Sequence, residues 1–124
     1  MIGKLAIQFK EILRWFTYIM NMSDYRYFKY SEFDSPDLEG SGKKMNDNFL
    51  EMLSEAREIS NTPFKITSGY RTKDYNIALQ NKGFKASKNS AHLKGLAADI
   101  SCTTSAKRWL IVDALIFAGI TRIG

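Results

Sequence analysis

Apolar residues recur with helical spacing in residues 3–20 and 45–60, and capping residues indicate two further helices. The predicted helices cover residues 3–20, 45–60, 73–79 and 106–118. Thr72 and Ser105 precede two of these helices and can act as N-caps. Asn61 and Pro63, and later Gly119, stand where helices are expected to stop.

Between the helices, the pattern predicts strands. Residues 64–68 alternate between polar and apolar, residues 96–102 are apolar enough for a well-buried strand, and residues 120–123 resemble the start of another. Because helices and strands mix without a regular βαβ repeat, we predict an α+β fold with a small mixed sheet flanked by helices. We assign residues 1–24 to an N-terminal amphipathic helix and residues 25–124 to the domain.

The polar face of the N-terminal segment has few cations, which favours packing against the domain or a partner chain over a membrane surface. Lys10, Glu11 and Arg14 interrupt its apolar runs, so it does not resemble a signal peptide. Its longest uncharged stretch is far below the roughly 20 residues of a transmembrane helix. We therefore expect a cytoplasmic protein that would reach the cell wall only after export or lysis. The single cysteine, Cys102, allows no intramolecular disulfide.

Positive charge is concentrated in one part of the chain. The formal net charge is +5, and residues 65–94 contain seven lysines and arginines against one carboxylate, Asp74. Such a surface attracts anionic partners, among them nucleic acid, anionic lipid and acidic cell-wall polymer. A solvated loop that lysines keep soluble would have the same composition. Few aromatic residues alternate with these lysines, so a specific nucleic-acid site is poorly supported.

One stretch holds the only histidine, His92, and an aspartate seven positions later. On a strand, Asp99 would share a face with Ala97 and Ser101, whose small side chains leave room for an ion and a substrate, whereas Cys102 would face away. Imidazole and carboxylate are both zinc donors, and a catalytic zinc takes three protein ligands and keeps one position open. By spacing alone, such a pair is more often a hydrogen-bonded structural pair.

Two motifs in this region together resemble a known family. Ser90, His92, Gly95, Ala97 and Asp99 form a Ser-x-His-x-x-Gly-x-Ala-x-Asp pattern, which is similar to the zinc signature of the metallo-D-alanyl-D-alanine carboxypeptidases. The wider fold group of that family includes hedgehog-type signalling domains and lysostaphin-like endopeptidases. Upstream, the Ser-Gly-Tyr-Arg sequence of residues 68–71 resembles a second element of the family at a similar interval. Two motifs in the right order are far more specific than either alone.

The resemblance implies a hedgehog/DD-peptidase-like fold and a set of roles. His92 and Asp99 would be ligands of a catalytic Zn²⁺. Arg71 would be a catalytic residue that binds the substrate carboxylate or a developing oxyanion, and Tyr70 and Ser90 would contact the substrate. A guanidinium group matches a carboxylate in two hydrogen bonds and stays charged. Arg71 could also be a surface arginine at a turn, and Ser90 could instead cap the turn before His92.

One part of the family pattern is missing. The resemblance implies a third zinc ligand, a histidine in a later element, with a general base nearby, but the chain has no second histidine. Two ligands should hold zinc weakly, and activation of a water molecule also requires a base within reach. We therefore expect a fragment of a longer protein, truncated at the C-terminal end of the family domain, or a natural truncation without activity. An end inside a predicted strand favours the fragment.

Three functions are considered. We favour a zinc-dependent peptidase that hydrolyses D-amino-acid amide bonds in peptidoglycan stem peptides, of the cell-wall carboxypeptidase or endolysin type. The first alternative is a non-catalytic peptidoglycan-binding or structural module of the same fold. The second is nucleic-acid binding through the lysine-rich segment. The oligomeric state and the bond cleaved stay open.

Overall fold

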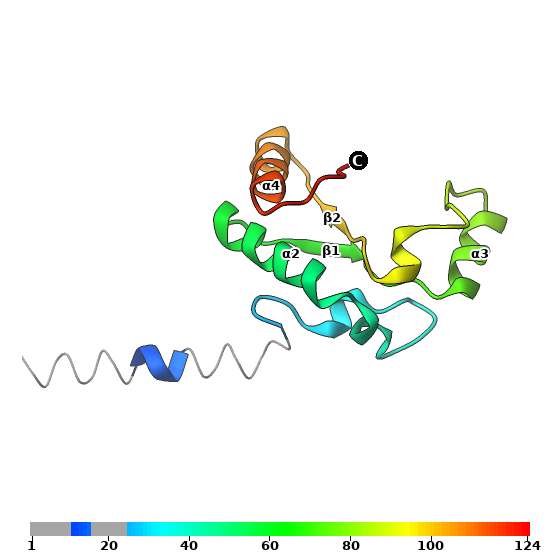
Figure 1. The fold of residues 1–124 in the computed structure, drawn as a ribbon, viewed down its shortest axis with the longest axis horizontal. Helices are drawn as coiled ribbons and strands as arrows, with labels where there is room; N and C mark the ends of the chain where they lie inside the picture. Colours follow the sequence, from blue (N-terminus) through cyan, green and yellow to red (C-terminus); the bar gives the residue numbers. More distant parts are fainter. Residues whose placement is uncertain (1–10, 16–24) are drawn as a thin grey trace, which may run out of the picture.

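The computed structural model describes residues 11–15 and 25–124 (Figure 1). Its α-helices are α2 (Asp47–Ser60), α3 (Lys73–Asn81) and α4 (Ser105–Phe117); its strands are β1 (Lys65–Ser68) and β2 (Asp99–Ser101); and its 3-10 helices are η1 (Tyr30–Phe33), η2 (Ser41–Lys44) and η3 (Ala91–Lys94). This mixture confirms the α+β class. Residues 11–15 are helical, and the rest of the helix predicted for residues 3–20 lies outside the described residues.

Helix α2 begins two residues later than the pattern predicts. The side chain of Asn46 is its N-cap and accepts a hydrogen bond from the backbone N–H of Phe49 at 3.0 Å. Met45, just before the cap, and Leu50, one turn into the helix, are both buried in the core, an arrangement that fixes how the chain enters the helix. The helix ends as predicted at Asn61, which is left-handed with φ 47°.

Threonine hydroxyls cap the other two helices. Thr72 caps α3 as predicted, since its Oγ1 accepts the N–H of Tyr75 at 3.1 Å. Helix α4 is capped by Thr104 and not by Ser105, because Thr104 is the residue with extended backbone and its Oγ1 accepts the N–H of Lys107 at 3.1 Å. The prediction for this cap was one residue late.

The strand predicted for residues 120–123 is not formed. Gly119 is left-handed with φ 100°, and the N–H of Ile120 donates to the carbonyl of Leu115 at 2.9 Å. This is a helix C-cap that ends α4, and Ile120 packs against the core. Residues 120–123 have no strand partner among the described residues, and a strand without a ladder is not stable.

The sheet of the described part of the chain is a single antiparallel pair, β1 with β2. Ile66 pairs with Ile100, and the next pair is Ser68 with Asp99, so β1 contains a bulge at Thr67. Ile66 and Ile100 pack against the core, whereas Asp99 is exposed. The well-buried strand predicted for residues 96–102 is therefore wrong in length and burial, because a two-stranded sheet covers only one of its faces.

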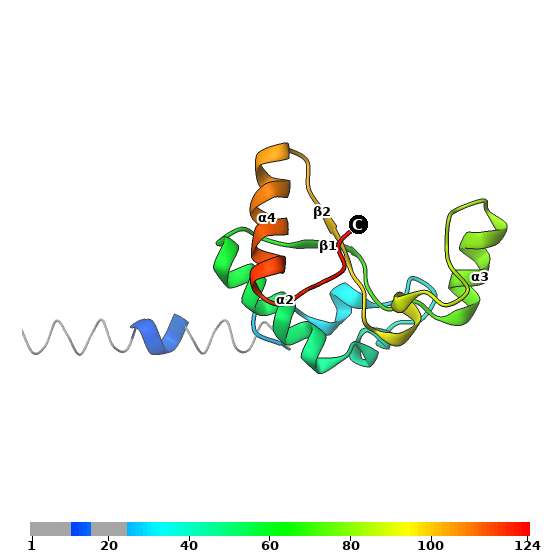
Figure 2. The ribbon, with the colours of Figure 1, turned by 45° about the horizontal axis from the view of Figure 1, so that its top comes forward.

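The core lies between α2, α4 and the sheet. Its buried apolar residues are Phe28, Phe33, Met45, Leu50, Leu53, Ala56, Phe64, Ile111, Ala114 and Leu115. Figure 2 shows α4 beside α2, whereas α3 lies at the opposite end of the domain, beyond β1 and β2. The strands join both ends: the Ser-Gly-Tyr-Arg motif lies at the end of β1, and the motif of residues 90–99 leads into the start of β2.

Two ion pairs and one phenol hydroxyl connect the start of the domain to α2. Arg26 forms ion pairs with Glu51 at 2.9 Å and Glu58 at 2.6 Å. The hydroxyl of Tyr25 donates to Glu51 at 2.7 Å, and this hydrogen bond is the main reason that the pKa of Tyr25 is raised to about 12. In the described ranges, no helix is both long and apolar enough to span a bilayer.

Candidate metal centre

His92 lies in η3, a single helical turn that is fixed at both ends. The Oγ of Ser90 accepts the N–H of His92 at 3.3 Å, and Gly95 ends the turn in a left-handed conformation with φ 67°. The Nδ1 of His92 lies 2.7 Å from the carbonyl oxygen of Gly69. Because a carbonyl can only accept, this contact places the proton on Nδ1 and leaves the lone pair of Nε2 available to a metal ion.

Asp99, the first residue of β2, faces that free nitrogen. Its Oδ1 lies 3.7 Å from the Nε2 of His92. The imidazole is 12% exposed and the carboxylate is 54% exposed, so the space between them opens to solvent. Tetrahedral zinc with bonds of about 2.0–2.2 Å places two ligand atoms roughly 3.3–3.5 Å apart. The two groups therefore converge on one point, at nearly the separation that a shared cation requires.

Arg71 holds the same carboxylate from its other side. Its Nη2 donates to the Oδ2 of Asp99 at 3.3 Å, and its Nε donates to the Oγ of Ser68 at 3.2 Å. The backbone N–H of Arg71 donates to the carbonyl of His92 at 3.1 Å. The side chain is only 15% exposed, which excludes an ordinary surface arginine. One oxygen of Asp99 thus faces the guanidinium and the other faces the imidazole.

The two glycines of the motifs permit close backbone contacts. A Cβ on Gly95 would lie 2.8 Å from the Cα of Met45, and the Gly95 carbonyl accepts the N–H of Asn46 at 3.0 Å. A Cβ on Gly69 would lie 2.6 Å from the Cα of Phe33. Neither position can hold a side chain without movement of its neighbours. The first contact ties the His92 turn to the start of α2, and the second brings the Gly69 carbonyl to His92.

The predicted site residues are not all brought together. The side chains of His92, Asp99 and Arg71 meet, as described above. The hydroxyl of Ser90 acts as the cap of η3, which is the alternative that the sequence left open. The ring of Tyr70 packs against the core, and the Nζ of Lys44 lies 5.4 Å from its centroid.

Two further partners were not predicted. Ser68 orients the guanidinium of Arg71, and its place in the Ser-Gly-Tyr-Arg element was a signal that could have indicated this. The carbonyl of Gly69 selects the histidine tautomer, and a backbone acceptor leaves no trace in a sequence.

The two side chains are of a kind that binds zinc, but a catalytic zinc takes three protein ligands. A neutral imidazole nitrogen and a carboxylate oxygen are both ordinary zinc ligands. In residues 11–15 and 25–124, no group of three or more His, Cys, Asp or Glu side chains is placed to hold one ion. The described residues therefore offer two side chains, His92 and Asp99, that could hold a zinc ion, and no third.

Comparison with known proteins bears on this geometry. A family model described as Peptidase M15 matches residues 26–124, a range that includes both motifs and every residue of the candidate centre. The chain belongs to the peptidase M15 family. No curated protein and no solved structure matches the chain. Membership of the M15 family identifies the domain as one of a family of metallopeptidases. The predicted resemblance is thereby confirmed at the level of the family.

Proposed function

We propose that this M15 domain hydrolyses amide bonds between D-amino acids in peptidoglycan stem peptides, with Zn²⁺ held by His92 and Asp99. The observation that supports this most directly is the 3.7 Å approach of the His92 Nε2 to the Asp99 Oδ1, with the tautomer of the imidazole already selected by Gly69. A purely structural His–Asp pair needs no tautomer that directs a free lone pair at a carboxylate. Such a pair also needs no guanidinium beside the other carboxylate oxygen, where Arg71 contacts the Oδ2 of Asp99.

Each residue of the candidate centre would have its own role in such a reaction. Zinc, when bound, polarises a scissile carbonyl and lowers the pKa of bound water. The Gly69 carbonyl keeps the Nε2 of His92 unprotonated, and Arg71 fixes the orientation of Asp99 through Nη2. The Nη1 of Arg71 has no partner among the described residues and can donate to a substrate carboxylate or an anionic oxygen. We propose that the third ligand and the general base lie outside the described residues.

The proposal places the site of action at the cell wall. Three lysines of the loop between α3 and η3, Lys82, Lys85 and Lys88, are exposed, and Lys85 lines the same cavity as Arg71. Their charge would attract an acidic wall polymer and raise the rate of encounter. The competing function is a non-catalytic module that binds peptidoglycan and does not hydrolyse it.

The first prediction concerns the metal. Replacement of His92 by Ala removes one of the two proposed ligands. Loss of a residue that only hydrogen-bonds a ligand typically lowers metal affinity by about 10–100-fold, so loss of the ligand itself should lower the affinity for Zn²⁺ by about 100-fold or more. Calorimetric titration with Zn²⁺ measures this fall. Release of D-alanine from a synthetic stem pentapeptide should be abolished both in H92A and in the wild type treated with a chelator.

Lys94→Ala is the matched control, because Lys94 is an exposed residue of the same turn and belongs to no contact of the centre. It should keep the zinc affinity of the wild type. Hydrolysis by H92A at the wild-type rate would contradict the mechanism. Zinc and peptidoglycan binding without any turnover in the wild type would instead support the non-catalytic module.

A further inference from the structure

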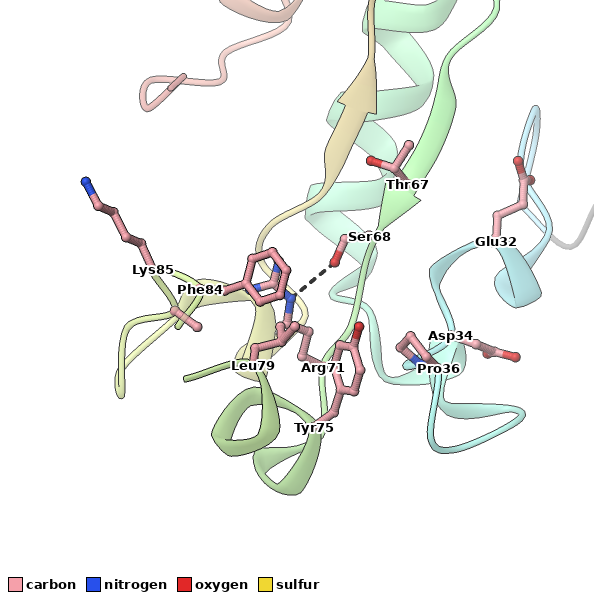
Figure 3. Close-up of a pocket in the computed structure, with 11 residues that line it drawn as sticks. Glu32, Asp34, Pro36, Thr67, Ser68, Arg71, Tyr75, Leu79, Phe84 and Lys85 are labelled. Atoms are coloured by element: carbon pink, nitrogen blue, oxygen red, sulfur yellow. Dashed lines mark hydrogen bonds between the residues drawn. The ribbon is translucent and has the colours of Figure 1, made fainter. Parts of the chain in front are cut away.

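A cavity of about 270 Å³ lies next to Arg71 (Figure 3). Its lining residues are Glu32, Asp34, Pro36, Thr67, Ser68, Arg71, Tyr75, Leu79, Phe84, Lys85 and Ala86. Neither His92 nor Asp99 belongs to this lining. Arg71 is therefore shared between the two regions, with Asp99 on its Nη2 and the cavity beside it.

The walls of the cavity have the chemistry of a peptide-binding site. Tyr75, Leu79 and Phe84 form one side in Figure 3, and the hydroxyls of Thr67 and Ser68 come from β1. The charged lining residues are two acids and two bases, so the cavity as a whole favours no net charge. Sites that take small molecules combine apolar and aromatic walls with a few polar groups, and commonly measure roughly 300–1,000 Å³. A volume slightly below that range fits a single amino-acid residue.

The aromatic rim is held in place by hydrogen bonds. The amide of Asn76, a buried residue, donates to the carbonyl of Ser87 at 2.9 Å, and the amide of Gln80 donates to the carbonyl of Ala86 at 2.7 Å. The N–H of Phe84 donates to the carbonyl of Leu79 at 3.0 Å. The loop is thus held to α3 at Phe84 and at the residues that follow it, whereas Phe84 itself is 63% exposed. An exposed aromatic ring that lines a cavity, on a backbone held by hydrogen bonds, is suited to cover a ligand.

We propose that this cavity is a subsite for a peptide residue on the carboxyl side of the bond cleaved, and that Phe84 determines its specificity. The inference rests on the proposed function. If the Arg71 guanidinium bound the terminal carboxylate of the substrate, the substrate would end at Arg71. No part of it would then occupy the cavity. A substrate that continues past Arg71 fills the cavity, and Arg71 then contacts an internal peptide oxygen. The substrate class is a peptide extended beyond the scissile bond, and the cleavage is endopeptidic.

Two synthetic stem peptides with the same scissile bond test the subsite. One ends in a free carboxylate one residue after that bond, and the other continues for two further residues. The extended peptide should have a KM about tenfold or more below that of the short one, since burial of one apolar side chain is worth that factor. Phe84→Ala should raise the KM of the extended peptide to that of the short one and leave the short peptide unchanged.

Phe117→Ala is the matched control, because Phe117 is 80% exposed on α4, at the other end of the domain from the cavity. It should leave both KM values unchanged. Preference of the wild type for the short peptide, or an equal effect of F84A on both peptides, would overturn the subsite while the zinc mechanism stands.

The affinity of the two peptides for the protein without added zinc gives a readout that needs no turnover. If zinc-loaded protein hydrolyses neither peptide, the proposed function fails. Tighter binding of the extended peptide that F84A abolishes would still establish the subsite, and equal binding of both peptides would reject it.

Discussion

At the scale of single residues, Gly95 does most to fix the position of His92. It ends the turn that holds the imidazole, adopts φ 67°, and presents its carbonyl to the cap of α2. A side chain at this position would be strained by the left-handed backbone and would meet the backbone of Lys44 and Met45. Backbone strain and steric overlap would therefore both destabilise a variant with a side chain at position 95.

Replacement of Gly95 by Ala should lower the free energy of unfolding by about 2–5 kcal/mol, the sum of left-handed strain and overpacking. Chemical denaturation measures it. Gly83→Ala is the control, because Gly83 has φ 87° and open space around it. That variant should lose only about 1 kcal/mol. Equal losses in the two variants would show that the contact with the start of α2 contributes nothing.

The centre could be predicted from the sequence where its residues fall in short motifs. His92, Asp99 and Arg71 were selected from two such motifs, and their side chains do meet. The contact between Arg71 and Asp99 was not predicted, because it joins residues 28 positions apart through the pairing of β1 with β2. Tyr70 was predicted to contact the substrate, which stays a prediction; its ring packs against the core.

At the scale of elements, α3 depends on one carboxylate. Asp37 accepts hydrogen bonds from the Ser35 hydroxyl at 2.5 Å and from the Thr72 hydroxyl at 2.6 Å. These two bonds, that of Ser35 first, hold the pKa of Asp37 below its ordinary value of 3.8. Since Thr72 is also the N-cap of α3, Asp37 connects the start of that helix to the loop after η1.

Acid should loosen this connection. A carboxylate whose pKa is depressed by folding stabilises the folded state above its unfolded pKa, and this contribution is lost as the pH falls through the folded pKa. Hydrogen exchange at the N–H of Tyr75, corrected for the intrinsic rate, should therefore accelerate several-fold below about pH 4. Asp37→Asn should exchange faster at neutral pH and lack this acid dependence.

The control for this experiment is Asp74→Asn, which removes an exposed carboxylate from the first turn of the same helix. It should keep the acid dependence of the wild type. Loss of that dependence in D74N, or its persistence in D37N, would assign the effect to another group.

The helices were predicted more accurately than the strands, for a physical reason. Helix ends are set by local caps, so Asn61 and Thr72 were predicted correctly and the start of α4 was wrong by one residue. A strand exists only where a partner pairs with it. Residues 96–102 form just the three-residue strand β2, and residues 120–123 form none.

At the scale of the whole molecule, the packing of α2 on α4 supports the sheet from which the centre projects. Leu53 of α2 is 2% exposed, and Ile111 and Leu115 of α4 belong to the same buried cluster. Replacement of Leu53 by Ala should lower the free energy of unfolding by about 2–5 kcal/mol, the range for buried leucines. This is a large part of the roughly 5–15 kcal/mol typical of a domain.

Ile59→Ala is the matched control, since Ile59 lies on the same helix and is 44% exposed. It should lose less than about 1 kcal/mol. Thermal unfolding of both variants gives the comparison. A cost as small for L53A as for I59A would mean that the interface between α2 and α4 does not stabilise the domain.

The bulge at Thr67 has a consequence for how this chain tolerates insertions and deletions. It gives β1 one residue more than β2 between two successive pairs, and Ser68 stands opposite Asp99 because that extra residue bulges out of the ladder. Loss of the Thr67 codon would leave Ser68 opposite Asp99 in a regular ladder, because the residue after Ile66 would then be Ser68. Regular pairing with Thr67 retained would instead put Thr67 opposite Asp99 and shift Ser68 and Arg71 by one position. The bulge is thus the position at which β1 can lose a residue and keep this pair, whereas the loop of residues 82–90 is held to α3 by the hydrogen bonds to Ala86 and Ser87.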